Sequence, residues 1–158
     1  MSLACFVTDY QLNVLDDAGY EAVIHHSQEQ MDAMGECKSA EQVATELLEY
    51  VQKYAPEPKK ALLAGNTVHA DKAFLVKEPY RKVVRHLHHR ILDVSAIKEA
   101  AKRWAPIDVL KASPQKAGKH EAKADILESI EEARYYKKVF FDKETSVGQD
   151  SVHDQTHA

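Results

Sequence analysis

The chain has 158 residues, of which 44% are hydrophobic and 29% charged, with 5 glycines and 5 prolines. This length and composition predict a single globular domain that can bury a core, and no apolar run approaches the roughly 18 residues of a membrane helix. Cys5 and Cys37 fit neither a disulfide framework nor a zinc site, so we expect two free thiols in a reducing compartment.

The formal net charge of −4 argues by itself against a nucleic-acid-binding protein, but the charge is unevenly distributed. Residues 59–103 carry 11 Lys or Arg against 4 Asp or Glu, together with four histidines, whereas residues 1–58 carry 2 against 11. The basic middle segment suits an anionic ligand. The same residues could form solvated helix faces, and the charge alone favours neither interpretation.

The beginning of the chain predicts a β-hairpin followed by a helix. Residues 3–8 form a strand that residues 11–15 continue after a turn at Asp9-Tyr10, and residues 20–26 form the next strand. Ser39 and Gln42 have the spacing of a capping box. The helix behind it repeats apolar residues on one face before Pro56 ends it: Val43, Leu47, Val51 and Tyr54.

Two further strands are predicted in the middle of the chain. Residues 61–65 form a short apolar strand whose end delivers residues 66–71, and a short helix follows Asp71. Pro79 opens a second helix over residues 80–86. Residues 90–94 form the last strand, after which Ser95 is placed to cap another helix.

The end of the chain predicts a loop, one long helix and a tail. Residues 105–119 form the loop, and Ala122, Ile126, Ile130 and Ala133 mark one face of the helix. We therefore expect an α/β fold, a mixed sheet flanked by helices, in one domain over residues 1–141. Residues 142–158 should form a disordered polar tail.

Two short stretches carry the chemistry, residues 65–71 and residues 120–125, and each ends in an aspartate. Hydrolysis of phosphodiesters by divalent metals needs carboxylates to hold the ions and a base to deprotonate water. His120 and Asp125 are five residues apart, about 140° on a helical wheel, so they cannot face one site from a regular helix. We expect His120 in the loop or first turn and Asp125 one turn inside.

These blocks, in this order, resemble the oligoribonucleases, and the resemblance covers nearly all of residues 3–141. It includes Gly65-Asn66-Thr67-Val68-His69 with Asp71, Arg90-Ile91-Leu92-Asp93-Val94-Ser95 with Lys98-Glu99 and Arg103-Trp104, and His120 with Ala122, Asp125-Ile126 and Glu128-Ser129. The resemblance implies a ribonuclease H-like fold and a homodimer. It also implies 3'-to-5' release of nucleoside monophosphates from short RNA oligonucleotides, dinucleotides above all, with Mg2+ or Mn2+.

The resemblance also implies the role of each site residue. Asp71 and Asp125 match two of the family's four acidic metal ligands, and His120 matches its general base. The family's terminal-phosphate site is matched by Thr67, Arg90 and Ser95. His89 stands where the family has a tyrosine that reaches the partner subunit. Although His86, His88 and His89 could suggest zinc, no further ligand has a workable spacing, so we expect an exposed basic helix end.

Besides the histidine at position 89, this sequence departs from the family in two serious ways. The family's first strand, a central one with an Asp-x-Glu pair that supplies the other two acidic ligands, has no counterpart in this sequence. About twenty residues are also absent between Cys37 and Lys38. We therefore expect an incomplete exonuclease domain in which one strand edge lacks its neighbour.

Three functional interpretations follow. The chain could be a 3'-to-5' exoribonuclease of uncertain activity, or a catalytically inactive relative that binds short oligonucleotides or a full-length subunit. It could also be the product of an altered transcript or gene prediction. The family works in the cytoplasm and in mitochondria, and no targeting segment is recognised in the sequence.

Overall fold

The computed structural model describes residues 2–24, 38–114 and 122–142. In chain order the elements are β1 (Ser2–Cys5), β2 (Tyr20–Val23), α2 (Ala40–Tyr54), β3 (Leu63–Gly65), α3 (Val68–Leu75), α4 (Arg81–His86), β4 (Ile91–Asp93), α5 (Val94–Trp104), α6 (Ile107–Lys111) and α7 (Ala122–Phe140). His120, residues 25–26 of the predicted strand and the tail beyond residue 142 lie outside the described ranges.

The four described strands form two separate two-stranded sheets. β1 and β2 pair antiparallel, with Cys5 opposite Tyr20, and β3 and β4 pair parallel, with Gly65 opposite Asp93. Within the described ranges no strand joins the two sheets. The mixed α/β class is therefore confirmed, while the absent central strand stays a prediction.

The hairpin of β1 and β2 is confirmed, but residues 11–15 do not extend it as a strand. Asp9 Oδ1 accepts hydrogen bonds from the backbone N–H groups of Gln11 and Asn13, both at 2.8 Å. Leu12 adopts a left-handed backbone with φ of 67°. The segment is therefore a turn held by one carboxylate, and only an isolated antiparallel bridge between Thr8 and Val14 remains of the predicted strand.

Helix α2 forms where the capping box predicts it. The Ser39 hydroxyl accepts from the backbone N–H of Gln42, and the Gln42 side chain accepts from the backbone N–H of Ser39. The predicted apolar face is buried, with Val43, Leu47 and Val51 at most 5% exposed. This face packs with residues of β2, α3 and α4 into the larger of the two apolar clusters that the described residues form.

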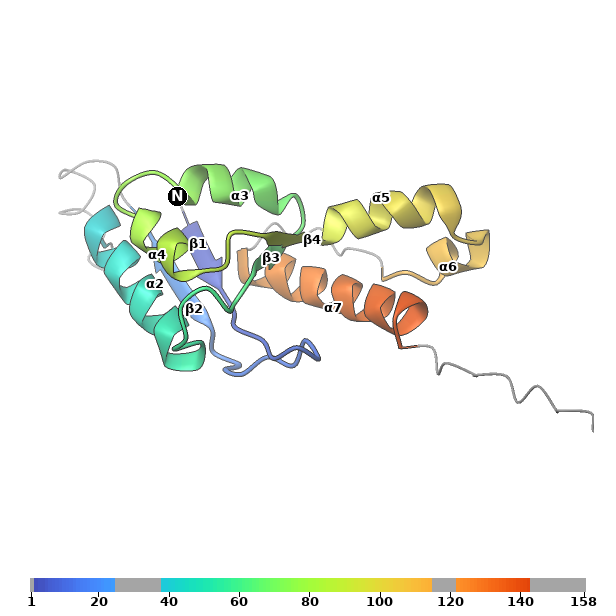
Figure 1. Cartoon of the computed structure of the whole chain (residues 1–158), viewed down its shortest axis with the longest axis horizontal. Helices are drawn as coiled ribbons and strands as arrows, with labels where there is room; N and C mark the ends of the chain where they lie inside the picture. Colours follow the sequence, from blue (N-terminus) through green and yellow to red (C-terminus); the bar gives the residue numbers. More distant parts are fainter. Residues whose placement is uncertain (1, 25–37, 115–121, 143–158) are drawn as a thin grey trace, which may run out of the picture.

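The smaller cluster lies between α5 and α7 and contains Val94, Ala101, Ala133 and Tyr136. α7 extends from the strands at the centre of the molecule to the end formed by α5 and α6, and it contacts β1, β3 and α5 (Figure 1). Ser129 and Glu132 are also buried on this helix. The predicted apolar face therefore includes polar side chains that its periodicity did not indicate.

Four further local predictions are wrong. α3 begins at Val68, so Asp71 lies in its first turn and not before it. α5 begins at Val94 directly after β4, and its N-cap is Asp93, whose side chain accepts from the backbone N–H of Ser95. Because Asp93 ends the strand with extended backbone, it occupies the capping position two residues before the predicted one.

The other two wrong predictions concern a loop and a histidine. Residues 107–111 of the predicted loop form α6, which follows Pro106, a residue tolerated before the first helical turn. His86 was expected at an exposed helix end but is 8% exposed. Its Nε2 lies 2.7 Å from the carbonyl oxygen of Ala55, which ties α4 to the end of α2.

Candidate functional site

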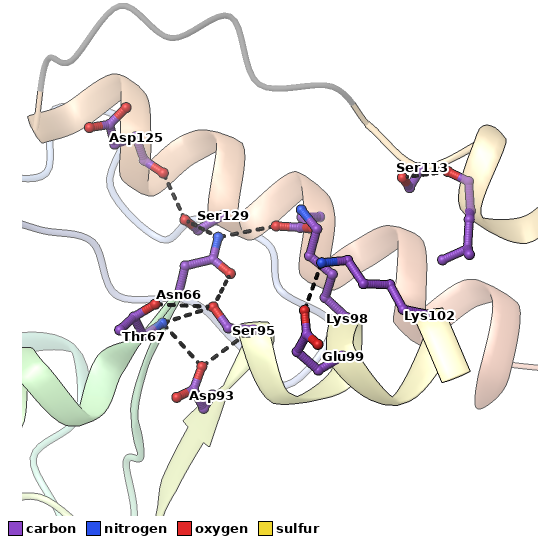
Figure 2. Close-up of polar contacts among 12 residues, drawn as sticks. Asn66, Thr67, Asp93, Ser95, Lys98, Glu99, Lys102, Ser113, Asp125 and Ser129 are labelled. Carbon is purple, nitrogen blue, oxygen red and sulfur yellow. Dashed lines mark hydrogen bonds and ion pairs between the residues drawn. The ribbon is translucent and has the colours of Figure 1, made fainter. Parts of the chain in front are cut away.

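The candidate site lies where the parallel strands β3 and β4 end side by side. Gly65, the last residue of β3, pairs with Asp93, the last residue of β4. The chain turns after Gly65 through Asn66 and Thr67 into α3, and it passes from Asp93 directly into α5. The residues just beyond both strands are therefore brought together (Figure 2).

Thr67 and Ser95, two of the predicted phosphate-binding residues, lie next to each other. Their hydroxyl oxygens are 3.4 Å apart, and the backbone N–H of Thr67 donates to Ser95 Oγ at 3.0 Å. Thr67 adopts a left-handed backbone with φ of 57°, which is unfavourable for a β-branched residue. The hydrogen bonds around it hold this conformation.

Asp93 joins the segment after β3 to the start of α5 through hydrogen bonds. Its Oδ1 accepts from the backbone N–H of Thr67 at 3.1 Å and from that of Ser95 at 3.0 Å. Its Oδ2 lies 3.4 Å from Nδ1 of His69 on α3. One carboxylate thus accepts hydrogen bonds from two backbone N–H groups. The Asp93 side chain is only 18% exposed. The prediction assigned no role to Asp93.

Asn66 connects this turn to α7. Its Nδ2 donates to Ser129 Oγ at 2.9 Å and to Glu132 Oε2 at 3.1 Å, and its Oδ1 accepts from Ser95 Oγ at 3.1 Å (Figure 2). Lys98 on α5 pairs with the other carboxylate oxygen of Glu132 at 2.8 Å. Asn66, Lys98 and Ser129 belong to the matching sequence blocks, but nothing in the sequence near any of them predicts that they meet.

Arg90 and His89 lie beyond the opposite end of β4 from Ser95. β4, which separates Arg90 from Ser95, has three residues and is about 10 Å long. The His88 and His89 rings stack with centroids 4.2 Å apart. Burial lowers the pKa of His88, and the nearby His89, Arg90 and Lys59 lower it further. His89, Arg90 and Lys59 are exposed, and among the described contacts none joins the Arg90 side chain to Thr67 or Ser95.

The predicted metal ligands, Asp71 and Asp125, lie in the first turns of α3 and α7. Asp71 is exposed, yet partial burial of its carboxyl raises its pKa, an effect that Asp93 adds to and His69 opposes. Across residues 2–24, 38–114 and 122–142, no three His, Cys, Asp or Glu side chains are placed to hold a metal ion. The described residues thus supply ligands of the right type but not a complete site.

Comparison with known proteins identifies the class to which this arrangement belongs. The family described as "Exonuclease" matches residues 6–133. The chain therefore belongs to the exonuclease family, whose domain has a ribonuclease H-like fold and whose members generally use divalent metal ions.

Relatives with curated names include oligoribonucleases. The chain is 40% identical to "Oligoribonuclease" of Leifsonia xyli subsp. xyli, over 89% of this chain and 75% of the relative. It is 37% identical to "Oligoribonuclease, mitochondrial" of Mus musculus, over 92% and 67%. It is 39% identical to "Probable oligoribonuclease" of Schizosaccharomyces pombe, over 87% of this chain but 60% of that protein. The predicted family is thereby confirmed.

In the described parts of the chain, none of the helices has the length and apolar character needed to cross a membrane.

Proposed function

We propose that the chain is a 3'-to-5' exoribonuclease that hydrolyses short oligoribonucleotides, dinucleotides in particular, to nucleoside monophosphates. The observation that carries this proposal is the pair of hydroxyls of Thr67 and Ser95, held together beyond two parallel strands. Hydroxyl groups and cationic side chains suit the oxygens of a terminal phosphate. The names of the relatives support RNA oligonucleotides as the substrate class.

In this proposal each predicted residue keeps its role. Thr67, Ser95 and Arg90 bind the terminal phosphate, and His120 is the general base that takes a proton from the attacking water. Asp71 and Asp125 are ligands of Mg2+ or Mn2+, the ion that would neutralise negative charge on the phosphate. The protein acts as a homodimer in which His89 contacts the partner subunit, and it works in the cytoplasm or in mitochondria.

The test is incubation of the purified chain with a 5'-labelled RNA dinucleotide, in Mn2+ and in EDTA. Asp71→Ala is the variant, and Asp108→Ala is its matched control, because Asp108 also lies in the first turn of a helix and is exposed. We expect release of mononucleotide in Mn2+ that is lost in EDTA and in Asp71→Ala but kept in Asp108→Ala.

Two other outcomes contradict the proposal. Binding of the dinucleotide without release would make the chain a non-catalytic oligonucleotide-binding protein. If a protein with a cooperative thermal transition shows neither binding nor release, both interpretations are wrong.

A further inference from the structure

We propose that Asn66 is a positioning residue, which orients the Ser95 hydroxyl and docks the turn of α7 that carries Asp125 against the phosphate-binding turn. The inference rests on the proposed function for what the positioned groups do. The docking of α7 itself does not depend on that function.

Asn66 connects three elements with one side chain. Its carbonyl oxygen accepts from Ser95, at the start of α5, and its amide nitrogen donates to Ser129 and Glu132 on α7. A side-chain amide can make about four hydrogen bonds, two as donor and two as acceptor, so most of this capacity is used. Asn66 is partly buried, where an unpaired partner left behind would be costly.

The contact with Ser95 decides which hydroxyl can donate to a ligand. A serine hydroxyl has one hydrogen, and that of Ser95 is directed to Asn66 Oδ1. Ser95 Oγ also accepts from the backbone N–H of Thr67. Only Thr67 can then donate in the 3.4 Å contact between the two hydroxyls. A bound phosphate oxygen would accept this hydrogen in place of Ser95 Oγ.

The contacts with α7 fix the helix at two successive turns. Ser129 accepts from Asn66 and donates to the backbone carbonyl of Asp125, four residues earlier, at 2.8 Å. Glu132 follows three residues after Ser129 and is 2% exposed. Asn66 is thus linked through one hydroxyl to the helical turn on which Asp125 lies (Figure 2).

The chemistry at position 66 requires an amide. Ser95 needs an acceptor, while the Glu132 carboxylate needs a donor. An aspartate would satisfy Ser95 but place a second negative charge against the buried carboxylate. Exchanging the two groups, in Asn66→Asp with Glu132→Gln, would restore one donor and one carboxylate at this contact.

The experiment compares four full-length variants with the wild type: Asn66→Ala, Asn66→Asp, the double variant Asn66→Asp/Glu132→Gln, and the control Asn13→Ala. Asn13 is an exposed asparagine that also bonds a carboxylate, in the turn after β1. Binding of a fluorescent RNA dinucleotide is measured in EDTA at a temperature where every variant is folded. Amide hydrogen exchange is followed over residues 122–142.

We expect Asn66→Ala to weaken dinucleotide binding about tenfold, the effect of one lost hydrogen bond to a partly buried partner, and to speed exchange in the first half of α7. Asn66→Asp should be weaker still, and the double variant should recover most of the loss. Asn13→Ala should match the wild type in both measurements.

A purely structural role would lower the melting temperature of Asn66→Ala and leave binding by the folded protein unchanged, and this result would overturn the proposal. Failure of the double variant to improve on Asn66→Asp would overturn it as well. If the wild type binds no dinucleotide, the proposed function fails. Exchange over α7 then decides separately whether Asn66 docks this helix.

Discussion

Lys98 on α5 and Glu132 on α7 form an ion pair of 2.8 Å in which the carboxylate side chain is 3% exposed and the ammonium side chain 35% exposed. The same carboxylate accepts from the Asn66 amide through its other oxygen. A buried carboxylate is costly unless it is paired and hydrogen-bonded. Glu132 is tolerated between two helices because both of its oxygens have partners from other elements.

Glu132→Ala should destabilise the protein by about 3 kcal/mol, at the lower end for a broken buried pair because Lys98 keeps some access to water. The variant leaves the Lys98 ammonium and the Asn66 amide without their acceptor. The measurement is the free energy of unfolding in urea. Glu131→Ala is the matched control, since this neighbouring glutamate is 58% exposed and should cost less than about 0.5 kcal/mol.

Thr67→Val should weaken binding of a dinucleotide about tenfold, because it removes the hydroxyl donor while keeping the branched shape. The melting temperature should change little, since the backbone N–H of Thr67 keeps both of its acceptors, Asp93 and Ser95. Fluorescence anisotropy in EDTA measures the binding. Thr45→Val, on the exposed face of α2, serves as the control, and equal affinities of the two variants would contradict the assignment.

Asp71→Asn should change how stability depends on pH. Since the folded-state pKa of Asp71 lies above its ordinary 3.8, ionisation of this carboxyl disfavours the folded state. This destabilisation is absent below the pKa that Asp71 has in the unfolded state. It develops as the pH rises from about 4 through the pKa of Asp71 in the folded state. The variant should therefore be slightly more stable than the wild type above this window and equal to it below.

Melting temperatures at a series of pH values measure the difference between Asp71→Asn and the wild type. The effect should be small because the residue is exposed. Asp108→Asn, at another exposed position in the first turn of a helix, is the matched control. A difference that grows toward low pH would have the wrong sign and would contradict the burial of the Asp71 carboxyl.

Gly19→Ala should destabilise the protein by about 2 kcal/mol. Gly19, in the turn before β2, has φ of 61°, and a Cβ built there would lie 2.6 Å from Cε1 of Phe6. The alanine therefore combines a strained backbone with a close contact to a ring. Urea unfolding measures the effect, and Asp17→Ala, at an exposed position in the same turn, should be nearly neutral.

The Cys5 thiol should react slowly with alkylating reagents at pH 8 in the folded protein. Burial raises its pKa to about 11, so little thiolate is present. The rate of iodoacetamide labelling in a Cys37→Ser background, with and without urea, measures this protection. Equal rates in the two conditions would contradict the partial burial of Cys5.

The features that the sequence predicts best are those that depend on neighbouring residues. The capping box of Ser39 and Gln42 and the apolar spacing behind it define α2 because both act within one or two turns. The competition between Asp93 and Ser95 for the cap of α5 could not be decided in this way. Both residue types cap helices well, and the outcome depends on where β4 stops pairing with β3.

The polar interior of the site depends on contacts between distant segments. Asn66 is 63 residues from Ser129 and 66 from Glu132, and no local periodicity indicates that they meet. Thr67 and Ser95 were assigned together only through the family resemblance. Ser129 and Glu132 interrupt an apolar face of α7 on the side that faces α5. These polar residues were the signal in the sequence that could have indicated the contacts with Asn66.

The small apolar cluster between α5 and α7 bears on the local unfolding of the molecule. α5 follows β4 without a connecting loop, and the turn at Asn66 is joined to α5 and α7 by hydrogen bonds. α5, α6 and α7 can therefore open as one cooperative unit while the cluster around α2 stays intact. Such an opening must separate α7 from β1 and β3, which it contacts, as well as break the hydrogen bonds of Asn66. Its free energy should still vary less with urea than that of global unfolding, because the cluster around α2 stays buried.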